Sequence, residues 1–163
     1  MSGSGGSYLA EYILKRDPKI KLSGTYRKKN QITKKLKNIK LYKCDLTNYN
    51  QIYKQLIKEK PDLIYHFASN ADVRGSFDYP MDIINNNNNV TLNLLESIRI
   101  IKNYNPVVVI CSTSEVYGLV KKKDTPIKEN QNYNPASPYA ISKTFQDLLA
   151  QNYRLNYGLN III

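Results

Sequence analysis

The stretch that decides the fold runs from Val107 to Lys143. It opens with the apolar run Val107-Val-Val-Ile-Cys111, continues as Ser112-Thr-Ser-Glu-Val-Tyr-Gly118, and closes with Ser137-Pro-Tyr-Ala-Ile-Ser-Lys143. A short run rich in β-branched residues is typical of a buried strand in a parallel sheet, so the first motif lies where this strand passes into a loop. Open α/β sheets bind their ligands at the carboxyl ends of the strands. We therefore expect the chemistry of the protein at the end of this strand.

The closing motif adds a pair of titratable side chains. Tyr139 and Lys143 are separated by one helical turn, which places a phenol and an ammonium on the same face of a predicted helix. Both can point into one cleft, and together they form a plausible proton-transfer pair.

Strand-like and helix-like segments alternate along the rest of the chain. The predicted helices are 8–16, 49–59, 81–102 and 138–157, and the predicted strands are 19–25, part of 36–44, 63–68, 107–112 and 159–163. This order indicates an α/β fold with a mostly parallel, doubly wound sheet. The phosphate-binding glycines of such a fold follow its first strand, yet only two residues precede Gly3. We therefore expect one Rossmann-like domain over 1–163, incomplete at both ends, without its first strand or a C-terminal substrate region.

Composition limits the class of protein. The 163 residues, 42% of them hydrophobic, suffice for one domain with a sizeable core. No apolar run approaches the roughly 18 residues of a membrane span, and the amino terminus does not resemble a signal peptide, so a cytoplasmic protein without a membrane partner is expected. Cys44 and Cys111 lie in no paired motif. We predict reduced, mostly buried thiols and no metal site.

The formal net charge of +11 raises the question of nucleic-acid binding. The lysines are spread over predicted helices and loops, and no helix-turn-helix, zinc-finger or RNA-recognition motif accompanies them. We interpret them as a solvated basic face, part of which can attract an anionic small molecule, and expect no nucleic-acid partner.

Several short motifs then match one family in order and spacing. Gly3-Ser-Gly-Gly6 resembles the latter part of a glycine-rich phosphate loop, Asp45-Leu46 an adenine-contacting pair, and His66-Phe-Ala-Ser69 a strand end beside a cofactor. Together with 76–80 and 91–96, they resemble the extended short-chain dehydrogenases/reductases, in particular the nucleotide-sugar epimerases and dehydratases. The resemblance covers essentially the whole chain. The cofactor-binding residues it implies are Gly3, Gly6, Asp45, Leu46, Phe67, Ala68, Ser69, Tyr139 and Lys143.

The choice of cofactor is predicted from the end of the second strand. An NAD enzyme usually has a carboxylate there, whereas the 2′-phosphate of NADP requires a cation. The run Gly24-Thr-Tyr-Arg-Lys-Lys29 contains no carboxylate. NADP is therefore favoured over NAD, with Arg27 as the phosphate partner because its planar guanidinium suits phosphate oxygens. The alternative is that Arg27 is only a loop cation.

The resemblance also implies a catalytic set. Tyr139, pushed towards phenolate by Lys143 and the positive nicotinamide ring, would take the proton from a sugar C4 hydroxyl. Thr113 would hydrogen-bond the C4 oxygen, and Lys143 would also hold the nicotinamide ribose. Glu115 is placed like the carboxylate that removes the C5 proton in sugar-nucleotide 4,6-dehydratases, where water then leaves from C6.

Two branches of the family compete for the reaction. Residues 6–12 and 112–115 resemble the GDP-mannose 4,6-dehydratases, whereas 137–143 with 146–150 resembles the GDP-4-keto-6-deoxymannose reductases, which need no C5 base. Because Glu115 has a defined role in a dehydratase, we favour that reaction with GDP-mannose as substrate. A reductase, a 4-epimerase, or an NADP-binding pseudoenzyme or sensor are the alternatives. Family members commonly dimerise through their two long helices, here 81–102 and 138–157.

Overall fold

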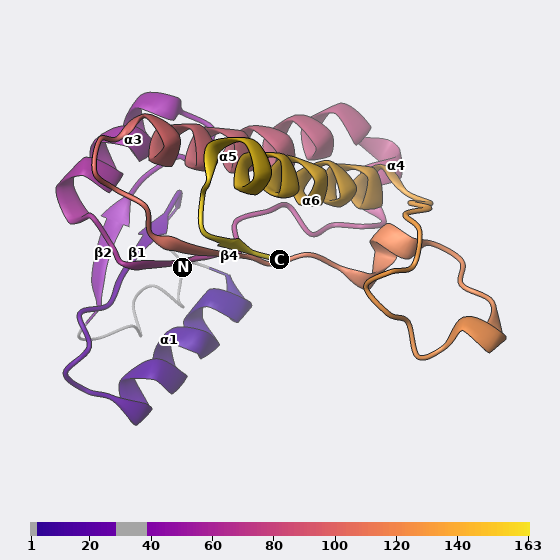
Figure 1. Cartoon of the computed structure of the whole chain (residues 1–163), viewed down its shortest axis with the longest axis horizontal. Helices are drawn as coiled ribbons and strands as arrows, with labels where there is room; N and C mark the ends of the chain where they lie inside the picture. The colour runs from indigo at the N-terminus through magenta and orange to yellow at the C-terminus, as the bar shows by residue number, and fades with distance from the viewer. Residues whose placement is uncertain (1–2, 29–38) are drawn as a thin grey trace.

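The computed structural model describes residues 3–28 and 39–163. Within these two ranges the structure contains five strands, and helices lie before, between and after them (Figure 1). The strands are β1 (Ser23–Tyr26), β2 (Lys40–Lys43), β3 (Leu63–His66), β4 (Val107–Ile110) and β5 (Ile161–Ile162), and the longer helices are α1 (Ser4–Arg16), α3 (Tyr49–Glu59), α5 (Pro80–Ile100) and α6 (Pro138–Tyr157). Residues 36–38 of the predicted strand region 36–44, and Lys29 of the cofactor run, lie outside the described residues.

All strand pairings in the described residues are parallel. β1 pairs with β2, while β4 lies between β3 and β5 with Leu63 opposite Val107 and Val108 opposite Ile161. Helices α3, α5 and α6 cover one side of the strands and α1 lies on the other (Figure 1). The predicted parallel, doubly wound α/β architecture is confirmed.

The parallel strands form two separate sheets. Among the described strands, β1 pairs with β2 and β3 pairs with β4, but β1 and β3 do not pair with each other. β1 and β3 line the same hollow of about 740 Å³, which also reaches α1, α3 and α5. The described strands therefore do not form one continuous sheet.

The core lies between the three-stranded sheet and the helices α3, α5 and α6. Val108 and Ile110 of β4 point into it, while Val107 and Val109 on the opposite face are only half-buried, because successive side chains of a strand alternate between faces. Leu95 and Ile98 of α5 have almost no exposed surface and pack in the same cluster. This packing fixes α5 and α6 against β4, and with them the site residues that these elements carry.

The helix ends follow local signals. The Ser137 hydroxyl accepts a hydrogen bond from the Ala140 N–H at 3.0 Å and caps α6, whose predicted bounds are confirmed. Gly158 ends α6 with φ of 68°, a left-handed conformation that favours glycine. The predicted start of the first helix at Tyr8 is wrong: α1 begins at Ser4, and the glycines that were expected to form a turn provide its N-cap and first turn.

The packing predicts a contrast between two leucines of α5. Leu95→Ala should lower the free energy of unfolding by about 3 kcal/mol, because the side chain is 0% exposed and its removal leaves a cavity. Leu92→Ala on the same helix is the matched control, since Leu92 is 37% exposed and should cost less than about 1 kcal/mol. Urea denaturation followed by circular dichroism measures both. Equal losses would contradict the described core.

Candidate cofactor-binding and active site

The residues predicted to bind the cofactor gather around the hollow between the two sheets, whereas Thr113 and Glu115 are not among its lining residues. Its lining includes every residue predicted from the sequence to bind the cofactor, drawn from α1, the ends of β1, β2 and β3, and α6. These residues are Gly3, Gly6, Arg27, Asp45, Leu46, Phe67, Ala68, Ser69, Tyr139 and Lys143. Segments far apart in sequence therefore meet at one cavity, as the parallel arrangement predicts.

The amino end of α1 contributes backbone donors to this cavity. Gly3 is the N-cap and Ser4, Gly5 and Gly6 form the first turn, whose N–H groups have no partner inside a helix. The positive end of the helix dipole adds to their attraction for an anion. This end of α1 has the chemistry needed to bind phosphate oxygens.

Opposite charges lie at the ends of β1 and β2. Asp45 Oδ1 accepts hydrogen bonds from the Thr47 N–H at 3.0 Å and the Thr47 hydroxyl at 2.7 Å. These bonds, and to a lesser degree the positive charge of Arg27, hold the pKa of the Asp45 carboxyl below its usual value. Arg27 itself is exposed directly after β1. Its guanidinium is therefore available to a ligand at the cavity rim.

Tyr139 lies beside Thr113 and Glu115 where the loop after β4 meets α6. Its side chain is 8% exposed, and this burial raises the pKa of the phenol above its usual value. A hydrogen bond with the Thr113 hydroxyl lowers that pKa, and the negative charge of Glu115 raises it. In the protein alone, burial outweighs this hydrogen bond, so the shift towards phenolate stays a prediction for the site with the nicotinamide ring bound.

The Lys143 ammonium is buried among hydrogen-bond acceptors. Its side chain is 4% exposed, and its ammonium donates to the Cys111 carbonyl oxygen and to Gln146 Oε1, the latter at 2.7 Å. Desolvation lowers the pKa of Lys143, while electrostatic interactions with Cys111 and Asp147 oppose this effect. Tyr139 and Lys143 line the same cavity, as predicted from their helical spacing.

A buried polar network behind Lys143 was not predicted from the sequence. Asn87 Nδ2 donates to Ser142 Oγ at 2.9 Å, and Ser112 Oγ donates to Asp147 Oδ2 at 2.6 Å. In the described part of the chain, Asp147 Oδ1 is buried without a hydrogen-bond partner, and burial raises the pKa of this carboxyl. The sequence did contain a signal for this network. Gln146 and Asp147 are polar and lie three and four residues after Lys143, so they share its face of α6.

His66 and the two cysteines complete the surroundings. His66 opens the motif predicted to end a strand beside the cofactor, and it lies at the end of β3 with 6% of its surface exposed. Burial, followed by the charge of Lys143, lowers its pKa to about 4. The prediction that both thiols are mostly buried holds for Cys44 but is wrong for Cys111. Cys111 is exposed because β4 ends at Ile110 and leaves it at the edge of the cavity.

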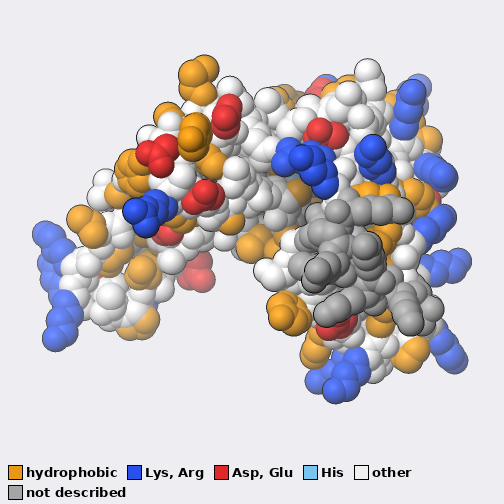
Figure 2. Space-filling model, turned by 180° about the vertical axis from the view of Figure 1, so that it is seen from behind, with side chains coloured by type: hydrophobic (Ala, Val, Ile, Leu, Met, Phe, Trp, Pro, Cys, Tyr) orange, Lys and Arg blue, Asp and Glu red, His pale blue; other side chains and the backbone are white. Residues whose placement is uncertain are grey.

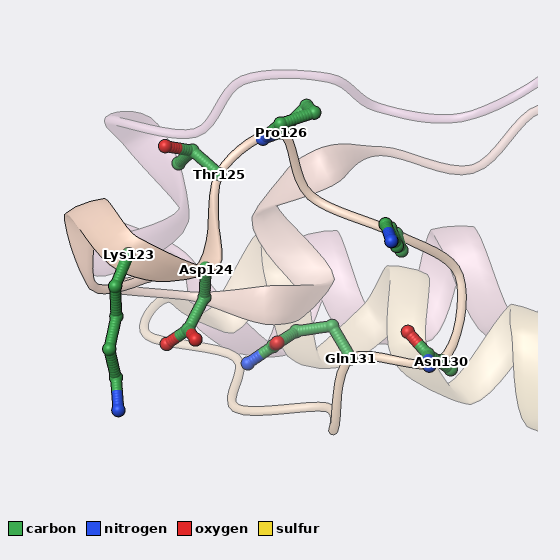
Figure 3. A pocket seen from close by; sticks show the side chains of 7 residues that line it. Lys123, Asp124, Thr125, Pro126, Asn130 and Gln131 are labelled. Carbon is green, nitrogen blue, oxygen red and sulfur yellow. The ribbon is translucent and has the colours of Figure 1, made fainter.

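A smaller hollow lies away from this site, in the loop before α6 (Figure 3). Its volume is about 330 Å³, and it is lined by Lys123, Asp124, Thr125, Pro126, Lys128, Asn130 and Gln131. It contains none of the predicted site residues.

Figure 2 shows lysine and arginine side chains at both ends of the molecule instead of in one compact patch. Across residues 3–28 and 39–163, no helix has the length and apolar character of a membrane span.

The fold and the cavity define a Rossmann-type protein of the short-chain dehydrogenase/reductase class. The family model for GDP-mannose 4,6 dehydratase matches residues 1–163. GDP-mannose 4,6-dehydratase from Vibrio cholerae is 32% identical over 177 residues, covering 98% of this chain and 45% of that protein. The chain therefore belongs to the GDP-mannose 4,6-dehydratase family, and it spans about half the length of the curated relatives it matches.

Solved structures agree with this assignment. UDP-glucose 4-epimerase from Thermus thermophilus, in complex with NAD, has a TM-score of 0.86 and 25% identity, covering 98% of this chain and 50% of that one. The RMD protein of Pseudomonas aeruginosa, complexed with NADPH, has a TM-score of 0.68 and 27% identity, covering 76% of this chain and 42% of that one. The predicted family resemblance is confirmed.

The contact between Tyr139 and Thr113 predicts the direction of a pKa change. Thr113→Val should raise the pKa of Tyr139 further, because it removes the hydrogen bond that opposes the effect of burial. NMR titration of tyrosine labelled with ¹³C at Cζ measures the pKa, with Tyr139→Phe identifying the resonance. Thr144→Val on α6 is the control, since the buried Thr144 hydroxyl has no hydrogen-bond partner among the described residues. A lower pKa in Thr113→Val would contradict the described contact.

Proposed function

We propose that this chain is the cofactor-binding part of an NADP-dependent GDP-mannose 4,6-dehydratase. The observation that carries the proposal is that Tyr139, which has Thr113 as a hydrogen-bond partner and is influenced by the charge of Glu115, lines the same cavity as Lys143. Membership of the dehydratase family supports the reaction, and the net charge of +11 suits an anionic nucleotide sugar. Within this proposal, residues 1–163 form a single NAD(P)-binding domain.

Each side chain has one role in the proposed reaction. Tyr139 takes the proton of the sugar C4 hydroxyl, and Thr113 donates a hydrogen bond to the same oxygen. The charge of Lys143 favours the phenolate once a ligand fills the cavity, and its ammonium binds a ribose hydroxyl. These residues would hold NADP⁺, which would supply the redox chemistry as acceptor of the C4 hydride and donor of that hydride to C6.

Glu115 determines the outcome after C4 oxidation. The ketone at C4 acidifies the C5 proton, which the Glu115 carboxylate takes. The C6 hydroxyl leaves as water with the proton that Tyr139 took from the C4 hydroxyl, so the phenolate is restored. The proton then returns to C5, so the product is a 4-keto-6-deoxy sugar and the carboxylate is regenerated. This role separates the dehydratase from the alternative GDP-4-keto-6-deoxymannose reductase, which needs no C5 base. The resemblance of residues 137–143 and 146–150 favours that alternative.

The preference for NADP rests on the end of β1. Arg27 is exposed, lines the cavity, and lies near enough to Asp45 for its charge to lower the pKa of that carboxyl. A guanidinium in this position suits the 2′-phosphate of NADP. The solved relatives include one with NAD and one with NADPH, so the residues of this chain must decide the preference.

The outer faces of α5 and α6 suit a homodimer. Several of their large apolar side chains are exposed although the two helices pack against each other, among them Met81 at 73% and Leu155 at 75%. Pairing these faces in a second copy would remove apolar surface from water.

The role of Arg27 predicts a cofactor-selective loss of affinity. Arg27→Ala should weaken NADP binding about tenfold, because a charge-assisted contact to phosphate is lost. Binding of NAD should stay nearly constant. Isothermal titration calorimetry with both cofactors measures the effect, and the exposed neighbour Lys28, changed to Ala, is the matched control. Equal losses for NAD and NADP would contradict the assignment of Arg27.

The role of Glu115 predicts a block after C4 oxidation. With GDP-mannose and NADP⁺, Glu115→Gln should form the 4-keto-6-deoxy product at least about 100-fold more slowly than the unmodified chain, because the C5 base is lost. Absorbance at 340 nm, which reports reduced cofactor, should still rise. Product analysis by mass spectrometry measures the block, and Glu11→Gln on the exposed face of α1 is the control. Full activity in Glu115→Gln would exclude the C5-base role. Cofactor binding without turnover in the unmodified chain would favour a binding module instead.

A further inference from the structure

A continuous set of buried hydrogen bonds joins Lys143 to His66 through α5 and α6. Lys143 Nζ donates to Gln146 Oε1 at 2.7 Å, and Gln146 Nε2 donates to Thr91 Oγ1 at 2.5 Å. Thr91 Oγ1 lies 2.9 Å from His66 Nε2. Gln146 and Thr91 are both 0% exposed. Protein groups, and not bulk water, therefore determine how Gln146 is oriented.

The amide of Gln146 has one favourable orientation. Its Nε2 group donates to the Asn87 carbonyl oxygen at 2.7 Å as well as to Thr91 Oγ1, which uses both of its hydrogens. A flipped amide would bring its oxygen against the Asn87 carbonyl oxygen, with no hydrogen between the two acceptors. Gln146 Oε1 is consequently held towards Lys143.

This orientation suits a buried cation. An ammonium has three N–H donors, and for Lys143 two of them bind Cys111 O and Gln146 Oε1. Both acceptors are uncharged, so they stabilise the positive charge without cancelling it. A carboxylate in place of Gln146 would neutralise the charge that Tyr139 needs nearby.

We propose that Gln146 is a positioning residue that holds the Lys143 ammonium in place and charged, leaving its third N–H for a ligand in the cavity. The inference rests on the function proposed above for Lys143. Gln146 acts only through Lys143, and Thr91 and the Asn87 carbonyl anchor it from α5.

The titratable groups around Lys143 come from three elements. β3 presents His66, whose lowered pKa keeps it neutral at physiological pH, and Cys111 follows β4. α6 presents Tyr139 and Asp147, the latter with a pKa raised by burial. α5 contributes only uncharged groups to this network. Beside these titratable groups, Gln146 supplies an uncharged acceptor 2.7 Å from the Lys143 ammonium.

Titration of Lys143 tests the proposal without requiring catalysis. NMR of the full chain labelled with ¹³C at lysine Cε gives the midpoint, with Lys143→Arg identifying the resonance. Gln146→Met keeps the side-chain length but removes the acceptor, so the midpoint should fall by about one pH unit because burial then lacks its compensating hydrogen bond. Thr91→Val removes one anchor of the amide and should shift the midpoint in the same direction by less.

Matched controls separate positioning from a purely structural role. Gln151→Met makes the same chemical change on α6, where Gln151 Nε2 donates to Tyr133 Oη at 3.1 Å, and should leave the Lys143 midpoint unchanged. A lower melting temperature with an unchanged Lys143 midpoint in Gln146→Met would overturn the proposal. If Gln146→Met fails to fold, an unchanged midpoint in Thr91→Val overturns it instead.

Cofactor affinity distinguishes this inference from the proposed function. NADP should bind Gln146→Met about tenfold more weakly than the unmodified chain, and Gln151→Met equally well. If the unmodified chain does not bind NADP, the proposed function is rejected. A lowered Lys143 midpoint in Gln146→Met would still support the contact between Gln146 and Lys143 in that case.

Discussion

The burial of the Lys143 ammonium is the interaction on which the candidate site depends. A charge withdrawn from water is costly unless hydrogen-bonding groups replace the solvent. The Cys111 carbonyl at the end of β4 and the Gln146 amide on α6 take that place. One acceptor follows β4 and the other lies on α6. The position of the Lys143 ammonium therefore depends on how α6 packs against β4.

That packing also links the core to the cavity. Val108 and Ile110 of β4, with Leu95 and Ile98 of α5, form the cluster on which α6 rests. Nearer the strand ends, α5 and α6 are joined by hydrogen bonds in place of apolar packing. Gln146 of α6 donates there to the Asn87 carbonyl oxygen and to Thr91 Oγ1 of α5. One helix pair thus stabilises the sheet and orients the site.

The sequence predicts most of the fold and the proposed ligand contacts, because both depend on local patterns. Alternating strand and helix signals specified the parallel, doubly wound arrangement, and strand-end motifs such as Asp45-Leu46 brought the expected residues to one cavity. The start of α1 was misjudged because glycines suit both a turn and a first helical turn. The exposure of Cys111, the raised pKa of Tyr139 and the Gln146 network depend on burial and on contacts between distant segments, which helical or strand periodicity does not reveal.

Hydrogen exchange of the full chain with and without NADP tests the central claim most directly, namely that the hollow between the sheets binds the cofactor. We expect slower exchange at the amides of 3–6 and 66–69 when NADP is present, since both segments line the hollow. Unchanged exchange in both segments, or protection confined to the loop hollow around Lys123 and Gln131, would contradict it.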